Sequence, residues 1–168
     1  MPPSTEIKIV LATSEFPTDD DLTSLLHKVY VDEGFTSDKH AEEILGATAV
    51  RRRGDLFVAL AGPESLLVGT VILVPPGSPS QQLAVGDEEA ELHLLAVPPA
   101  YRKLGIGRQL VSRALKEARS RGILRVLLWT QPTMRAAQRL YDDVGFVRIP
   151  SRDFRRYERD FLVMQVEL

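Results

Sequence analysis

A short turn rich in glycine and basic residues lies in the second half of the chain, and its composition suits an anion. It reads YRKLGIGRQL and runs from Tyr101 to Leu110. An amphipathic stretch follows, so the turn opens into the N-terminus of a predicted helix. Such an end presents unpaired N–H groups and a partial positive charge, which favour a phosphate or pyrophosphate. The alternative is an ordinary surface turn, since Gly-x-Gly alone is common and Gln109-Leu110 match neither the dinucleotide nor the P-loop pattern.

The overall composition limits the other kinds of chemistry. The chain has 168 residues, no cysteine and three histidines. Thiolate zinc sites, disulfides and cysteine nucleophiles are therefore excluded. His27, His40 and His93 show no metal-ligand spacing, so we expect no metal. The length suits one domain covering residues 1–168.

Charge is unevenly distributed along the chain. In total, 21 Lys and Arg nearly balance 23 Asp and Glu, which argues against an overall basic nucleic-acid binder. Residues 1–98 hold six basic and sixteen acidic side chains, whereas residues 99–168 hold fifteen basic and seven acidic ones. This asymmetry indicates two partners of opposite charge, or simply solvated helix faces with many arginines.

The sequence contains no evident address or membrane span. Its start, MPPSTEIKIV, has no basic region followed by a long apolar stretch, so it does not resemble a signal peptide. Residues 66–86 are uncharged, but prolines and polar residues interrupt them, and a helix needs about 20 apolar residues to cross a bilayer. We expect a soluble cytoplasmic protein that has no membrane partner.

The apolar pattern alternates between strand and helix periods. Thr18 can cap a helix whose first turn holds three aspartates, and Ser37 can cap a second helix that ends near Arg53. Two further helices are predicted over residues 107–121 and from Met134 to the stop at Gly145. The predicted strands are Ile7–Ala12, Leu56–Ala61, Leu66–Val74, Ala90–Val97, Arg125–Thr130, Phe146–Ile149 and Phe161–Leu168.

The element order is β-α-α-β-β-β-α-β-α-β-β. Hairpins in the first half indicate antiparallel pairing, and the strand–helix–strand unit of residues 90–130 predicts one parallel pair. The expected fold is α/β of mixed type: a mostly antiparallel seven-stranded sheet with about four helices.

Two motifs resemble those of a known family. Arg102-x-x-Gly105-x-Gly107 is similar to the R/Q-x-x-G-x-G/A signature of the GNAT superfamily, the acyl-CoA-dependent N-acyltransferases. The run MRAAQRLYDDVGF, residues 134–146, resembles the family's second signature, N-x-x-A-x-x-L-Y-x-x-x-G-F. The element order also agrees with the family fold. One departure is Met134, which stands where many members have an asparagine that contacts CoA.

The resemblance implies acetyl-CoA as co-substrate and assigns roles by position. Strand residues 95–97 would hydrogen-bond the pantetheine arm through their backbone, at a gap between two strands, and the amides of residues 102–108 would hold the pyrophosphate. Tyr141 would act as general acid near the thioester sulfur. The implied cofactor-binding residues are Leu95, Ala96, Val97, Arg102, Lys103, Leu104, Gly105, Ile106, Gly107 and Arg108.

The implied reaction is direct transfer of an acetyl group to a primary amine of a small molecule or peptide. Because an alkylammonium has a pKa near 10.4, a base must take its proton. The resemblance makes Glu91 the expected catalytic base, since it matches a position that serves as base in some members, although it could equally hold a cationic substrate. His93 lies on the same face of an ideal strand, so His93 or a water stays an alternative. A phenol is a weaker acid than a thiol, so hydrogen bonding to the departing sulfur is the safer role for Tyr141.

The acceptor stays open at this point. Acidic residues of the expected acceptor region favour a cationic amine: Asp32, Glu33, Asp87, Glu88 and Glu89. An arginine cluster near the last hairpin could instead admit an anion or an RNA: Arg152, Arg155, Arg156 and Arg159. A non-catalytic acyl-CoA sensor of the same fold is the alternative function. A nucleic-acid partner is the least favoured reading, and a homodimer is compatible with the resemblance.

Overall fold

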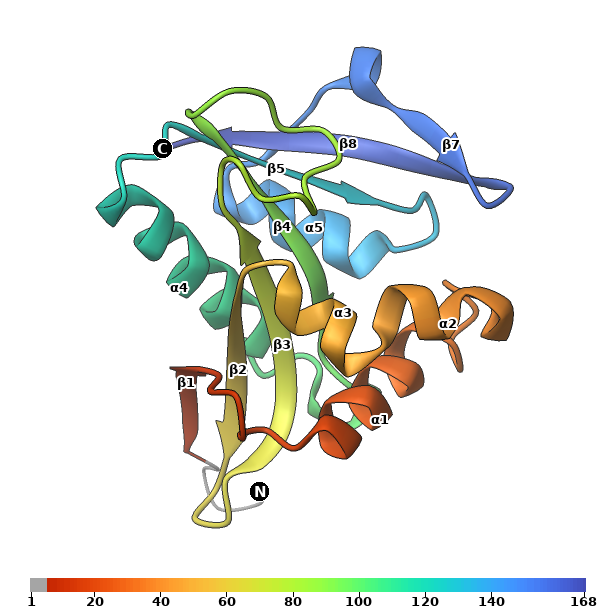
Figure 1. The fold of residues 1–168 in the computed structure, drawn as a ribbon, viewed down its shortest axis with the longest axis vertical. Helices are drawn as coiled ribbons and strands as arrows, with labels where there is room; N and C mark the ends of the chain where they lie inside the picture. The colour runs from red at the N-terminus through yellow and green to blue at the C-terminus, as the bar shows by residue number, and fades with distance from the viewer. Residues whose placement is uncertain (1–5) are drawn as a thin grey trace.

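The computed structural model describes residues 6–168 and has a twisted sheet with helices on both faces (Figure 1). Residues 1–5, which belong to the start that we expect not to be a signal peptide, lie outside the described residues. None of the helices in the described part is long and apolar enough to cross a membrane.

Eight strands and five α-helices make up the fold of residues 6–168. The strands are β1 (Ile7–Leu11), β2 (Asp55–Ala61), β3 (Leu66–Val74), β4 (Glu89–Ala96), β5 (Arg125–Thr130), β6 (Val147–Arg148), β7 (Phe154–Arg156) and β8 (Arg159–Glu167). The helices are α1 (Asp19–Tyr30), α2 (Asp38–Leu45), α3 (Ala47–Arg52), α4 (Ile106–Ser120) and α5 (Arg135–Val144), with short 3-10 turns η1 (Pro99–Tyr101) and η2 (Pro150–Arg152).

The strands pair in the order β1-β2-β3-β4-β5-β8-β6, and β7 pairs with β8. Every pair is antiparallel except β4 with β5, which is parallel and is joined by α4. The predicted mixed, mostly antiparallel sheet with one parallel pair is therefore confirmed.

Alternation along β2 shows how the three layers form. Phe57 and Ala59 pack in a core cluster with α4 and α5, whereas Leu56 and Val58 pack in a second cluster with α1, α2 and α3. Because successive strand residues point to opposite faces, a strand that is covered on both sides must be apolar throughout. Figure 1 shows α4 and α5 on one face of the sheet and the first three helices on the other.

The structure corrects the second predicted helix. It is broken at Gly46 into α2 and α3, because Gly46 has an extended ψ of 135°. A Cβ at this position would lie 2.6 Å from the carbonyl oxygen of Glu42, so the break needs glycine. The Thr18 cap is as predicted, and its side chain accepts a hydrogen bond from the N–H of Asp21.

The structure also adds a strand, which raises the sheet from the expected seven strands to eight. β7 and β8 form a hairpin whose turn residues, Tyr157 and Glu158, have φ values of 53° and 61°. Two-residue turns of this kind usually carry Asn-Gly or Asp-Gly, since other residues are strained at positive φ. The sequence Tyr-Glu therefore gave no turn signal. The other strand limits differ from the prediction by at most two residues.

Candidate functional site

The sheet separates between its two central strands. β4 and β5 pair only from Glu89 to Glu91, opposite residues 125–127. Beyond that point β4 contains a bulge, where Leu94 has a φ of 51° and the register with β3 shifts. Thr70 supports the bulge, because its hydroxyl donates to the carbonyl oxygen of Leu94 over 2.9 Å. Residues 92–97 therefore border a gap on the side of β5.

The turn before α4 presents a row of free amides beside this gap. Lys103 and Gly105 have φ values of 63° and 78°, which turns the chain tightly into the helix. Within residues 6–168, none of the six backbone N–H groups from Lys103 to Arg108 donates a hydrogen bond; the first that does is that of Gln109, to Gly105. Such a concave row of N–H groups at a helix N-terminus favours an anion.

Arg102 holds this turn in place. Its guanidinium makes a two-point contact with the carboxylate of Glu33, with distances of 2.7 and 2.5 Å, and its Nε donates to the carbonyl oxygen of Val97 over 2.8 Å. The hydrogen bonds that Arg102 donates to Glu33 raise the pKa of Arg102 above its ordinary value. Since all three guanidinium nitrogens contact the protein, we infer that Arg102 positions the amides rather than binding the anion itself.

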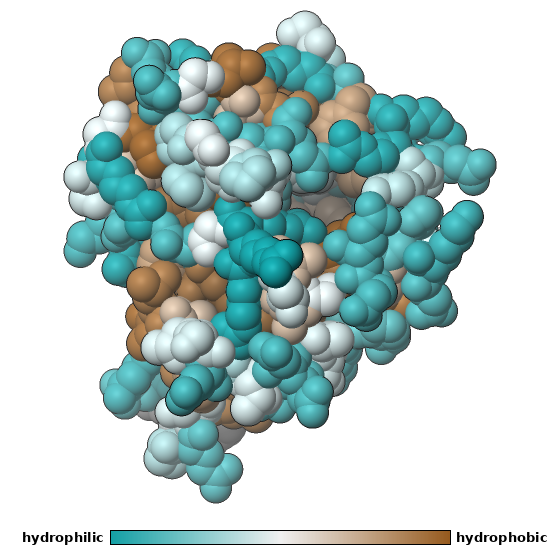
Figure 2. Space-filling view, in the orientation of Figure 1, coloured by the Kyte–Doolittle hydropathy of each residue, from teal (hydrophilic) through white to brown (hydrophobic). Residues whose placement is uncertain are grey.

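A cavity of about 1140 Å³ extends from this turn into the gap between the strands. It lies between α1, α2, α5 and the β7–β8 hairpin, and Figure 2 shows a hollow to the right of centre with hydrophilic residues at its rim. Eight of the ten predicted cofactor-binding residues line it: Leu95, Val97, Arg102, Lys103, Gly105, Ile106, Gly107 and Arg108. Ala96 instead packs in the opposite core cluster, and Leu104 is exposed.

Tyr141 lies on α5 and lines the cavity. It is 7% exposed, and its ring packs against that of Phe146, with 5.7 Å between the ring centroids. Burial raises the pKa of Tyr141 above its ordinary value. The phenol therefore keeps its proton at neutral pH and can donate a hydrogen bond into the cavity. Met134 precedes α5 and also lines the cavity. Its thioether sulfur accepts a hydrogen bond from the hydroxyl of Thr130.

Glu91 is fully buried behind the cavity wall and is not among the lining residues. Its carboxylate accepts hydrogen bonds from the N–H groups of Gln82, Leu83 and Ala84. Burial acts to raise the pKa of Glu91, but the hydrogen bonds from His93 and from the N–H groups of Ala84 and Leu83 outweigh it, so the pKa lies below its ordinary value. A carboxylate with so many donors is a poor proton acceptor, which weakens the expectation that Glu91 is the base.

His93 stands between Glu91 and the cavity. Its Nε2 lies 2.8 Å from Oε1 of Glu91, and its Nδ1 lies 3.3 Å from Nη1 of Arg53. Because an ionised carboxylate only accepts, these partners assign the hydrogen of a neutral ring to Nε2 and leave Nδ1 as an acceptor. Burial lowers the pKa of His93, and the hydrogen bond that His93 donates to Glu91 acts in the opposite direction.

Sequence reasoning missed three residues of this cavity: Tyr30, Arg53 and Trp129. The hydroxyl of Tyr30 donates to the carbonyl oxygen of Leu95 over 2.8 Å, and thereby ties α1 to the bulged strand. Trp129 contacts the ring of His93 edge-on, with 4.6 Å between centroids. No local signal marks these residues, because Tyr30 continues an apolar helical stripe and Arg53 ends a run of three arginines.

The acidic residues that suggested a cationic acceptor do not line the cavity: Asp32, Glu33, Asp87, Glu88 and Glu89. Glu33 binds Arg102, and Glu89 is buried beside Arg152, with 3.3 Å between the charged groups. Because those charges lie elsewhere, they give no support to a cationic acceptor in this cavity, and the charge of the acceptor stays a prediction.

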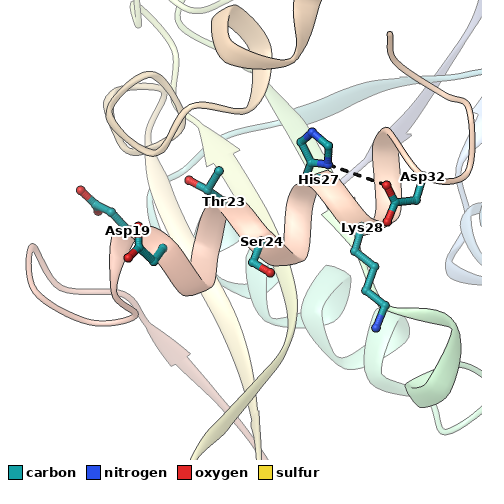
Figure 3. Close-up of a pocket in the computed structure, with 7 residues that line it drawn as sticks. Asp19, Thr23, Ser24, His27, Lys28 and Asp32 are labelled. Carbon is teal, nitrogen blue, oxygen red and sulfur yellow. Dashed lines mark ion pairs between the residues drawn. The ribbon is translucent and has the colours of Figure 1, made fainter. Parts of the chain in front are cut away.

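Asp32 belongs to a second, smaller depression on the outer face of α1 (Figure 3). In Figure 3 the side chains point outward from the helix, and His27 lies 3.8 Å from Asp32. Both side chains are more than 40% exposed, so we interpret this acidic face as solvated surface. Among residues 6–168, no group of three or more His, Asp and Glu side chains is arranged to hold a metal ion.

Comparisons with known proteins agree with the motifs. The sequence model of the acetyltransferase (GNAT) family matches residues 17–146. The mycothiol acetyltransferase of Cellulomonas flavigena is 36% identical over 90 residues, which are 53% of this chain and 26% of that protein. The ribosomal protein bS18-alanine N-acetyltransferase of Escherichia coli K12 is 36% identical over 59 residues, 35% of this chain and 40% of that protein. The chain spans less than half the length of these curated relatives.

Solved structures share the fold over nearly the whole chain. An acetyltransferase of Streptococcus agalactiae superposes with a TM-score of 0.75 at 21% identity, covering 96% of this chain and 98% of that one. A Bacillus subtilis acetyltransferase in complex with CoA gives a TM-score of 0.66 at 22% identity, covering 97% and 99%. At such identities the likeness concerns the fold alone.

Proposed function

The chain belongs to the acetyltransferase (GNAT) family, and from this premise we propose that it transfers an acetyl group from acetyl-CoA to a primary amine. The observation that carries the proposal is the row of six free N–H groups at the start of α4, which opens onto a cavity holding Tyr141 and His93. An anion site, a hydrogen-bond donor and a base thus share one cavity, which is what direct acyl transfer requires.

The residues of the cavity fit CoA in two respects. The free amides of residues 103–108, with the charges of Lys103 and Arg108 beside them, suit a pyrophosphate. The gap next to Leu95 and Val97 exposes strand backbone that can hydrogen-bond the amides of a pantetheine arm. Bound acetyl-CoA would supply an acetyl group on a sulfur leaving group.

His93 is the base in this proposal, and Glu91 is a positioning residue. Glu91 fixes the ring of His93 through Nε2. Nδ1, which lies 3.3 Å from Nη1 of Arg53, is then the atom that takes the proton of the amine once the guanidinium of Arg53 releases it. The lowered pKa of His93 keeps the ring neutral at pH 7 and ready to accept. As the amine nitrogen bonds to the acetyl carbon and the carbon–sulfur bond breaks, the Tyr141 hydroxyl donates a hydrogen bond to the sulfur that leaves.

The test measures thiol release and CoA binding in parallel. We expect the protein to bind CoA and to release thiol from acetyl-CoA when a suitable primary amine is present, with the N-acetylated amine as product by mass spectrometry. Calorimetry gives the CoA affinity independently of turnover. CoA binding without thiol release for any amine of a broad panel would instead indicate the non-catalytic sensor.

Gly105 provides a sharp test of the amide row. In Gly105→Ala, the positive φ of 78° becomes strained, and we expect a loss of about 1–2 kcal/mol of unfolding free energy. The strain should also turn the amides away from the anion and weaken CoA binding about tenfold. Urea denaturation and calorimetry measure the two effects.

Gly77 is the matched control for this variant. It has a φ of 81°, and, as at Gly105, nothing lies within 4 Å of an added Cβ, but it belongs to the loop after β3 and does not line the cavity. Gly77→Ala should lose similar stability and keep its CoA affinity. Equal CoA affinities in the two variants would remove the pyrophosphate from the start of α4.

A further inference from the structure

One end of the cavity carries cationic side chains that are not ion-paired with any carboxylate of residues 6–168. This acceptor end lies opposite the amide row and is lined by α2, Arg53, His93, Trp129 and the β7–β8 hairpin. Its cationic side chains are Lys39, Arg53, Arg156 and Arg159, against one carboxylate, that of Glu158. None of these four cations forms an ion pair within the part of the chain that the structure describes.

Arg53 is the most informative of them because it is largely buried. Among the described residues, the hydrogen-bond partners of its guanidinium are neutral groups, namely the carbonyl oxygen of Ile44 and Nδ1 of His93. Burial lowers the pKa of Arg53, and nearby Tyr30 partly offsets this effect. A buried charge without a counterion is costly. An anion that enters the cavity would remove that cost, and it would lie directly beside the proposed base.

The hairpin arginines separate into two kinds. Arg155 pairs with Asp160 over 2.9 Å and is not among the lining residues, whereas its neighbour Arg156 lines the cavity and donates to the side-chain oxygen of Gln82. Arg159 donates to the carbonyl oxygen of Gly34 and to the side chain of Gln131. The two cavity arginines thus add positive potential at the mouth, which attracts an anion.

An aromatic row runs from the base toward these arginines. It is formed by Trp129, Phe154 and Phe161, with centroid distances of 6.0 and 5.1 Å between successive rings. Trp129 contacts His93 at one end, and the guanidinium of Arg156 lies 5.4 Å from the ring of Phe154. All three rings line the cavity. They offer an apolar surface next to the place where the amine must react.

We propose that the acceptor is a free amino acid with an apolar or aromatic side chain, whose carboxylate binds Arg53 and whose amine faces His93. Its side chain lies along the aromatic row. Arg53 and His93 are in contact. A carboxylate bound to Arg53 and an amine facing His93 must therefore lie within a few bonds of each other, which places both groups in one small molecule. This inference rests on the proposed acetyl transfer and names its acceptor class.

The direct test compares ligands that differ only in charge. N-acetylphenylalanine and N-acetylphenylalaninamide are titrated into the protein with saturating CoA, and leucine and alanine pairs extend the series. We expect each acid to bind at least about tenfold more tightly than its amide, because the carboxylate gains a charge-assisted hydrogen bond. Phenylalanine should likewise exceed phenylalaninamide in kcat/KM for thiol release.

Variants locate the anion site. In Arg53→Gln, each N-acetyl amino acid should bind about as tightly as its amide, while CoA affinity stays the same. Arg53→Lys should recover part of the preference for the acid. If Arg53→Gln does not fold, Arg156→Gln and its matched control Arg155→Gln decide the case. Arg156→Gln should lower kcat/KM for phenylalanine about threefold at low salt, and Arg155→Gln, at the ion-paired neighbour, should not.

The outcomes separate the acceptor class from the activity. The acceptor class would be overturned if amino acid amides, or a peptide amide whose first residue is alanine, were acetylated as fast as every free amino acid. Acetyl transfer itself would remain supported. Acid-selective binding without thiol release would support the anion site and contradict the activity. If CoA binds and no acid binds more tightly than its amide, the anion site is wrong.

Discussion

The variant His93→Gln is expected to lower kcat about 100-fold or more, in line with the usual contribution of a positioned general base. Glutamine can still donate to Glu91 from its side-chain amide, so the buried contact survives while the acceptor nitrogen is lost. Steady-state thiol release with a saturating amine measures the effect.

The pH dependence of kcat distinguishes a base from a structural histidine. Burial above all, together with the charge of Arg53, lowers the pKa of His93, and the contact with Glu91 acts to raise it; the pKa lies below its ordinary value of 6.5. The ring of Trp129 also contacts His93. A base works only when deprotonated, so wild-type kcat should hold down to pH 6.5 and fall below it as His93 gains a proton. The glutamine variant should lack this fall.

His40 supplies the control for the same substitution. It lines the outer part of the cavity and contacts the ring of Tyr157, with 4.1 Å between centroids, but it has no contact with Glu91. His40→Gln should therefore keep kcat within about twofold of wild type. If kcat of His93→Gln is also within about twofold of wild type and still falls at low pH, the amine proton leaves through water and His93 has another role.

Tyr141→Phe is expected to reduce kcat about 100-fold, the scale of losing one donor that stabilises developing charge. The substitution removes one oxygen and keeps the ring against Phe146, so the packing of α5 should persist. Acetyl-CoA affinity should change by less than about twofold, because the hydrogen bond to sulfur gains strength only as the bond breaks. Single-turnover thiol release and calorimetry separate the two quantities.

The same deletion at Tyr101 tests whether any hydroxyl of the cavity has this effect. Tyr101 belongs to η1 and lines the cavity near the amide row. Tyr101→Phe should leave kcat within about twofold of wild type.

Since burial raises the pKa of Tyr141, wild-type kcat should also show no alkaline fall below about pH 10. An unchanged kcat in Tyr141→Phe would end its role with the leaving group.

Local patterns predicted those parts of the fold that depend on neighbours in sequence. The strands Leu66–Val74 and Arg125–Thr130 have the predicted limits, because each is a continuous β-rich apolar run. The cap at Thr18 is also as predicted. The amide row before α4 could be anticipated for the same reason, since two glycines and a helix start lie within a few residues.

The remaining parts depend on contacts between distant segments. Arg102 and Glu33 are 69 positions apart, and nothing in either segment shows that the arginine is already paired. Glu91 is removed from solvent by the loop that donates three amides to it, so its residue type alone suggested a freer carboxylate than the fold provides. The different roles that we propose for Glu91 and His93 follow from the position of that loop, which the sequence around Glu91 does not indicate.

The gap between β4 and β5 has a consequence for the energetics of binding. The bulge at Leu94 is held by Thr70, and β5 stays paired with β8 as far as Thr130, so each strand keeps a partner on its outer side. The protein alone therefore holds the two strands apart. An incoming ligand does not have to break a strand ladder, and its contacts with the exposed backbone appear in the affinity with little lost to reorganisation.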